Sequence, residues 1–152
     1  MAGCISLISQ IAGMNKFFSS NPVALQSGLT VVRIIVGAFM IYHGWEVFDA
    51  AKMKEYAAWD VFKKFPSAIF MVYLGKGAEL VAGIMLAIGW FTRIAAIILI
   101  GTMFYISFFV GNGKVWYEDQ HPFLFVLLGL VFFFAGGGKY SVDNVMFGKK
   151  VE

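Results

Sequence analysis

Two pairs of polar side chains interrupt the apolar parts of this chain, each with a spacing of three residues. Lys76 and Glu79 form one pair inside a long apolar run. His43 and Glu46 form the other, at the end of an earlier apolar run. Residues three apart share one face of a helix, so each pair can form a hydrogen bond or an ion pair. Charges inside membrane helices are costly, and they often mark proton or ligand chemistry.

Each pair supports more than one interpretation. Glu79 could handle protons, or it could be the structural ion-pair partner of Lys76 or Arg33, and Lys76 could instead reach the lipid headgroups. Histidine titrates near neutral pH, so His43 with Glu46 could be a proton-handling pair or a cluster at the membrane interface. In an antiparallel helix pair, His43 and Glu79 would lie toward the same membrane face. A proton-handling pair of His43 and Glu79 is therefore a further hypothesis.

Arg33 and Tyr105 complete the set of candidate site residues. Arg33 lies one turn into the first apolar run, where it could bind lipid phosphate or reach inward to a carboxylate. Tyr105 belongs to an aromatic run that could line a pocket for a quinone ring or face lipid. A fixed positive charge from Arg33 or Lys76 would stabilise a developing quinol anion in a dry site.

The composition indicates that these residues are held in a membrane. Of the 152 residues, 60% are hydrophobic and only 14% are charged, against about 25% charged in soluble proteins. The mean hydropathy is +0.78. A net charge of +3 could suggest a nucleic-acid partner. The basic residues are dispersed among apolar segments, however, so we expect the lipid bilayer and not nucleic acid as the partner.

Cysteine and histidine are too few for several redox or metal centres. The chain has one cysteine, Cys4, and two histidines, which lie far apart in the sequence. A single cysteine forms no internal disulfide and no C-x-x-C motif. We therefore expect no dithiol centre within the chain and no metal site.

The apolar runs predict an all-α fold, an integral membrane four-helix bundle. A helix needs about 20 residues to cross a bilayer, and four runs approach that length, at about residues 29–48, 67–91, 93–111 and 121–138. The mixed segment 49–66 predicts an interfacial helix between the first two. Residues 1–27 predict an amphipathic N-terminal segment, and residues 139–152 a polar C-terminal tail.

Three ordered motifs resemble those of the DoxX family. They read R-I-I-V-G-A-F-M-I-Y-H-G-W at 33–45, G-K-G-A-E-L-V-A-G-I-M-L-A-I-G-W-F-T-R at 75–93, and G-G-G-K-Y-S-V-D at 136–143. Together they place a DoxX-like domain of four transmembrane helices at about residues 28–148.

The resemblance implies a small multi-pass protein of the prokaryotic inner membrane. It suggests a quinone-linked redox subunit of the thiosulfate- or thiol-oxidising type, which would work with a partner redox protein. His43 and Glu79 would then be catalytic, with Arg33, Lys76 and Tyr105 binding the quinone. An alternative is a non-enzymatic scaffold for a redox or stress-response complex. A small transporter is the third and weakest hypothesis, because four short helices leave little room for alternating access.

Overall fold

The computed structural model describes residues 22–148, in which every regular element is helical. The predicted segment 1–27 therefore lies mostly outside the described residues. The elements are α2 (Leu25–Gly44) with a 3-10 turn (Trp45–Phe48), α3 (Ala50–Ala57), α4 (Asp60–Lys63), α5 (Ala68–Ile88), α6 (Thr92–Tyr105) with a π-helical turn (Ile106–Val110), α7 (Gln120–Ala135) and α8 (Val142–Phe147).

Three of these helical segments are long and apolar enough to cross a membrane. They comprise Leu25–Phe48, Ala68–Ile88 and Thr92–Val110. The fourth predicted helix is α7, which is apolar but has only 16 residues. It ends at Ala135 because Gly136 and Gly138 adopt positive φ angles of 72°. At about 1.5 Å per residue, α7 is shorter than the hydrocarbon core of about 30 Å.

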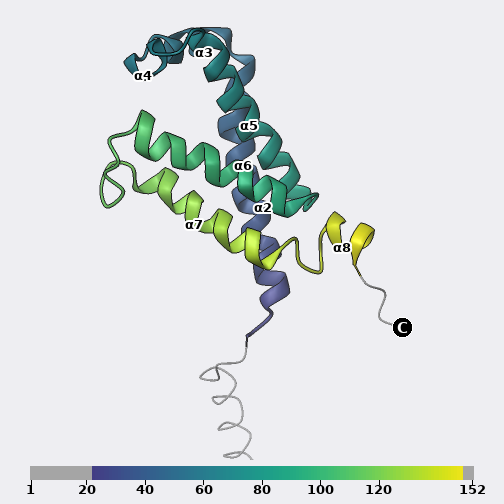
Figure 1. Ribbon diagram of the computed structural model, residues 1–152. Helices are drawn as coiled ribbons and strands as arrows, with labels where there is room; N and C mark the ends of the chain where they lie inside the picture. The colour runs from purple at the N-terminus through teal and green to yellow at the C-terminus, as the bar shows by residue number, and fades with distance from the viewer. Residues whose placement is uncertain (1–21, 149–152) are drawn as a thin grey trace, which may run out of the picture.

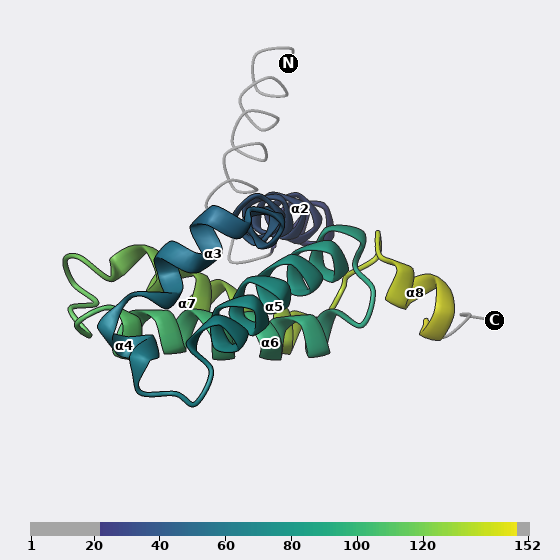
Figure 2. The same cartoon turned by 90° about the horizontal axis from the view of Figure 1, so that it is seen from above.

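The long helices are arranged as two crossing pairs. In Figure 1, α6 and α7 lie side by side and cross α2 at a steep angle, while α5 packs along α2 and also contacts α6. Figure 2 agrees, because α2 is seen almost end-on while α6 and α7 extend across the view. The short helices α3 and α4 lie at one end of α2, and α8 lies near its other end.

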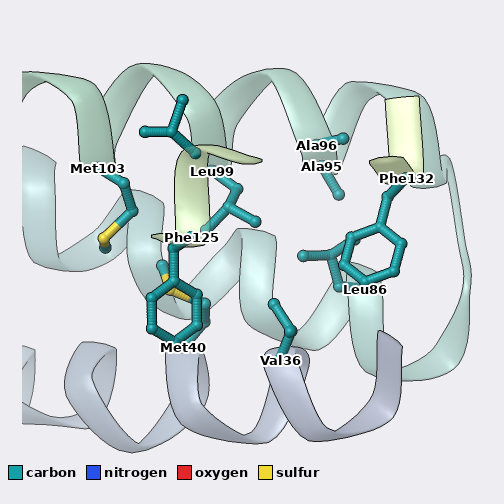
Figure 3. Close-up of a cluster of buried hydrophobic side chains, with 10 residues drawn as sticks. Val36, Met40, Leu86, Ala95, Ala96, Leu99, Met103, Phe125 and Phe132 are labelled. Carbon is teal, nitrogen blue, oxygen red and sulfur yellow. The ribbon is translucent and has the colours of Figure 1, made fainter. Parts of the chain in front are cut away.

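A continuous apolar core joins the two pairs. Figure 3 shows Met40 of α2 and Leu86 of α5 packed together with side chains of α6 and α7. Both residues are fully buried. Large apolar side chains on the outer faces of the same helices remain exposed, among them Ile35, Phe70 and Ile97. A buried seam with an apolar exterior is the arrangement expected of helices that lie in lipid.

Glycines let the backbones of α2 and α5 touch directly. A Cβ atom added at Gly37 would lie 2.6 Å from the Ala87 backbone nitrogen and 2.8 Å from the Gly83 carbonyl oxygen. A Cβ atom added at Gly83 would lie 2.7 Å from the Ile41 nitrogen. These distances are shorter than van der Waals contact. The crossing therefore depends on the missing side chains at Gly37 and Gly83, as in other small-residue membrane interfaces.

The link between the first two long helices contains two short helices in place of one long predicted helix. The Asp49 carboxylate accepts hydrogen bonds from the amides of Ala51 (3.0 Å) and Lys52 (3.2 Å), and it therefore caps the start of α3. α3 ends at Ala57, and Trp59 is extended before α4 begins at Asp60. This break turns the link, and several of its aromatic side chains, over the side of α5.

The loop before α7 is closed by a buried carboxylate. Asp119 accepts hydrogen bonds from the amides of Asn112 and Lys114, both at 2.9 Å, and is 8% exposed. Asp119 thus satisfies backbone amides that would otherwise be buried without partners.

Two glycines of α2 provide a matched test of the crossing. We expect Gly37→Ala to lower the melting temperature of the purified protein in detergent, because its Cβ would press on the α5 backbone. Gly28→Ala should raise stability by about 0.5–1 kcal/mol, since nothing lies within 4 Å of its Cβ position. Equal melting temperatures for both variants would contradict the close crossing.

Candidate functional site

The Lys76–Glu79 pair predicted from the sequence is formed, and it lies deep in the structure. Both residues belong to α5, and the Lys76 Nζ atom lies 3.0 Å from the Glu79 Oε2 atom. The Glu79 side chain is only 3% exposed. A carboxylate this buried needs a counter-charge, which Lys76 supplies.

Glu46 of the first helical segment also binds Lys76. Its Oε2 atom lies 3.0 Å from the Lys76 Nζ atom, so the ammonium group bridges two carboxylates. The Lys76 Nζ atom also lies 3.4 Å from the backbone oxygen of His43. Glu46 is therefore part of an interhelical ion network, and within the described residues no hydrogen bond or ion pair joins it to the His43 ring.

Two residues of α3 extend this arrangement toward the surface. The Lys52 Nζ atom lies 2.7 Å from the Glu46 Oε1 atom, and the Tyr56 hydroxyl donates to the Glu46 Oε2 atom at 3.0 Å. The Lys76 ammonium also lies 5.5 Å from the centre of the Tyr56 ring, within cation–π range. We call these residues the charged network: Glu46, Lys52, Tyr56, Lys76 and Glu79.

The charged network is electrically balanced. Two carboxylates, Glu46 and Glu79, face two ammonium groups, Lys52 and Lys76, and each contact is 3.0 Å or shorter. Burial and the hydrogen bond to Glu46 raise the pKa of the Tyr56 hydroxyl. Tyr56 therefore remains a protonated hydrogen-bond donor at neutral pH.

The Lys76–Glu79 pair forms part of the wall of an apolar cavity of about 380 Å³. This volume falls within the range of about 300–1,000 Å³ typical of small-molecule sites. The cavity lies between α5, α6 and the α3–α4 link. Its other lining residues are mainly aromatic or aliphatic, namely Tyr56, Trp59, Phe62, Met71, Val72, Leu74, Gly75, Ala78, Gly101, Thr102, Tyr105, Ile106 and Val110.

Three of the five candidate residues thus share one cavity. Lys76, Glu79 and Tyr105 all line it. Trp59 and Phe62 of the link also line it, although neither is among the candidate residues of the sequence. Their position over α5 could not be read from helical spacing, because it depends on the break between α3 and α4.

His43 lies outside this cavity and does not pair with Glu79. No hydrogen bond or ion pair joins its ring to Glu79 in the part of the chain that the structure describes. The ring lies instead near His121 at the start of α7, with 6.3 Å between the two ring centres. The ion-pair partner of Glu79 is instead Lys76 on its own helix, and the interhelical contact is the one between Lys76 and Glu46.

Arg33 lies at the opposite end of α2 and binds backbone atoms. Its side chain is 2% exposed, and its NH1 atom donates to the carbonyls of Leu86 and Ala87 in the last turn of α5. Its NH2 atom donates to the Tyr140 carbonyl at 2.7 Å. Thirteen residues separate Arg33 from Glu46, which is about 20 Å along a helix. The Arg33 side chain is therefore buried away from lipid phosphate and does not line the cavity, and its role in quinone binding stays a prediction.

The third sequence motif secures the same end of the molecule. The Asp143 carboxylate accepts hydrogen bonds from the amides of Phe91 (2.6 Å) and Thr92 (2.8 Å), where α6 begins. Ser141 caps α8 by accepting from the Asn144 amide at 3.1 Å. The motif thus joins the C-terminal segment to the α5–α6 turn and contributes nothing to the cavity.

The groups that line the cavity have the chemistry of a ligand site. They offer an ammonium donor, a buried carboxylate and aromatic surfaces within an apolar wall. Across residues 22–148, no group of three or more His, Cys, Asp or Glu side chains is placed to hold a metal ion. The groups of the cavity wall suit a flat, uncharged ligand with polar oxygens.

Long apolar helices around a buried ion network define a helical multi-pass membrane protein. The sequence pattern of the DoxX family matches residues 28–112. An uncharacterized protein of Haemophilus influenzae is 32% identical over 128 residues, which cover 80% of this chain and 92% of that protein. The chain belongs to the DoxX family. No solved structure matches it.

Removal of Lys76 tests the ion pair directly. We expect Lys76→Met to destabilise the protein by about 3 kcal/mol or more, because it leaves the Glu79 carboxylate buried without a counter-charge. Combining it with Glu79→Leu should recover most of that loss, and thermal unfolding in detergent would measure both. Additive losses in the double variant would show that the pair is not coupled.

Removal of Arg33 should affect stability without affecting the cavity. We expect Arg33→Met to lower the free energy of unfolding by about 1–3 kcal/mol for each buried acceptor left unsatisfied. Arg93→Met is a suitable control, because Arg93 is exposed near the same end of the molecule. A stability of Arg33→Met equal to that of this control would contradict the structural role.

Proposed function

We propose that this DoxX-family protein is the quinone-binding membrane subunit of a redox system. The supporting observation is the Lys76–Glu79 pair in the wall of the aromatic-lined cavity between α5, α6 and the α3–α4 link. The protein would lie in the prokaryotic inner membrane, with α7 also embedded, and would receive electrons from a thiol or thiosulfate donor or from a partner redox protein.

The cavity suits a quinone ring in both shape and polarity. Trp59, Phe62 and Tyr105 offer aromatic surfaces against which a flat ring can stack. The Lys76 ammonium can donate a hydrogen bond to one quinone oxygen. Leu74 lines the cavity and is 54% exposed among apolar helices, so the cavity reaches the lipid-facing surface. A quinone dissolved in the bilayer could therefore enter sideways, without crossing water.

The charges of Lys76 and Glu79 suit the reduction of a quinone as well as its binding. Two electrons and two protons convert a quinone to a quinol. A fixed positive charge at Lys76 stabilises the negative charge that develops on the ring oxygen, most strongly in a dry site. Glu79 is the carboxyl group placed beside that ammonium and can donate a proton. The proposal assigns no step to His43 or Arg33, since neither lines the cavity.

Glycines in the cavity wall allow a direct test of binding. The Trp59 fluorescence, measured after the other tryptophans are changed to Phe, should be quenched when a short-tailed benzoquinone binds in lipid nanodiscs. We expect Gly75→Leu to weaken this binding about 10-fold or more, an increase in binding free energy of about 1.4 kcal/mol. Gly75 lines the cavity, and no atom lies within 4 Å of its added Cβ.

Gly77→Leu is the matched control for Gly75→Leu. Gly77 lies on the same helix and also has open space at its Cβ position, but it does not line the cavity. Gly101→Leu should reproduce the loss of binding from the α6 wall. Equal quinone affinity in all three variants would exclude this cavity as the binding site.

A turnover assay separates the redox subunit from a scaffold. The purified protein, alone and with proteins that co-purify with it, would be assayed for thiol- or thiosulfate-dependent quinone reduction. Glu79→Gln should lower the rate while leaving quinone affinity nearly unchanged. A stable partner complex that neither binds nor reduces quinone would favour the scaffold function.

A further inference from the structure

We propose that the charged network is the pathway by which protons reach the cavity from the α3 side of the membrane. This inference rests on the proposed quinone-binding function. It assigns a role to Glu46 and Lys52, two residues that do not line the cavity, and it gives quinone reduction a defined side for proton uptake.

The contacts form an unbroken line from the interior to the surface. From Glu79 the line passes to Lys76 at 3.0 Å, to Glu46 at 3.0 Å, and to Lys52 at 2.7 Å. Side-chain exposure increases at every step, from 3% at Glu79 to 17%, 22% and finally 46% at Lys52. Each contact is short enough for a proton to move along a hydrogen bond.

Glu46 is the member through which a proton must enter. Its two oxygens bind different partners, with Lys52 on Oε1 and with Lys76 and Tyr56 on Oε2. Within residues 22–148 no hydrogen bond or ion pair joins Lys76 directly to Lys52, and the Glu46 carboxylate contacts both ammonium groups. The other charged or titratable side chains acting electrostatically on the network are His43, Asp49 and, through His43, His121.

The ends of the molecule determine the direction of proton entry. Lys52 belongs to α3, outside the apolar helical segments, at the end of α2 that Figure 1 shows beside α3 and α4. At the opposite end, Arg33 is buried and donates to backbone carbonyls. No corresponding line of ionisable side chains runs from Glu79 toward Arg33 within the residues that the structure describes.

The transfer conserves atoms and charge. The Lys76 ammonium passes a proton to the Glu79 carboxylate. The acid form of Glu79 gives this proton to an oxygen of the reduced quinone, so that an O–H bond forms on the quinol as the Glu79 O–H bond breaks. Glu46 takes a proton from a hydronium ion beside Lys52, which leaves a water molecule, and passes the proton to the neutral Lys76 amine. A second cycle supplies the second proton, and the thiol or sulfur donor of the proposed function supplies both electrons.

The test uses the full chain in nanodiscs, a short-tailed benzoquinone and electrons from an electrode through a soluble mediator. We expect Glu46→Gln to bind the quinone with unchanged affinity, measured by Trp59 quenching, but to form quinol about 10-fold more slowly or worse. Added acetate should restore the rate, because a small acid can replace the missing carboxyl group. A purely structural role of Glu46 would not respond to acetate.

Glu118→Gln is the matched control, because it removes the carboxylate of an exposed Lys–Glu pair with Lys114, and neither residue lines the cavity. If Glu46→Gln does not fold, Glu46→Asp retains the carboxyl group on a side chain one methylene shorter, and its slower rate must also respond to acetate. A wild-type rate in Glu46→Gln would overturn the pathway and leave the proposed quinone site intact. A slow rate that acetate does not restore would overturn it too. Failure of the unmodified protein to bind quinone would instead reject the proposed function.

Discussion

The direct backbone contact between α2 and α5 determines where the interior charges of this protein lie. Gly37 and Gly83 meet at the centre of that contact, and the two helices run in opposite directions. Arg33 lies one turn before Gly37, so it meets the last turn of α5 beyond Gly83. On the other side of the contact, Glu46 follows Gly37 and meets Lys76, which precedes Gly83. The register between α2 and α5 therefore places Arg33 at the backbone carbonyls that end α5. The same register places the charged network at the opposite end of the helix pair.

The two ends satisfy their charges by different means. At the Arg33 end, the Leu86 and Ala87 carbonyl groups in the last turn of α5 accept from a guanidinium group, and Leu86 also accepts from the Gly89 amide. The favourable position of a cation at a helix C-terminus adds to this stabilisation. At the Glu79 end, carboxylates and ammonium groups alternate and their charges cancel. In an apolar surrounding both arrangements are needed, because an unpaired charge there would cost several kcal/mol.

Much of the fold, but less of the site, could be predicted from the sequence. The lengths of the apolar runs indicate the four apolar helices, and the spacing of Lys76 and Glu79 correctly indicates their ion pair. Helical spacing says nothing, however, about register between helices, and so His43 was assigned to Glu79 while Glu46 was separated from Lys76. Arg33 shows the same difficulty, because its acceptors are backbone carbonyls, which carry no sequence signal.

The cap that Asp143 supplies to α6 has a consequence for the order of synthesis. The amides of Phe91 and Thr92 donate to the Asp143 carboxylate, which lies 52 and 51 residues later in the chain. The ribosome therefore releases the α5–α6 hairpin with its turn still open, and Arg33 lacks its Tyr140 acceptor at that stage. The contact of α8 with the start of α6 can therefore form only after Asp143 has been translated. Assembly of the membrane domain is thus finished from its C-terminal end, after the apolar helices have been made.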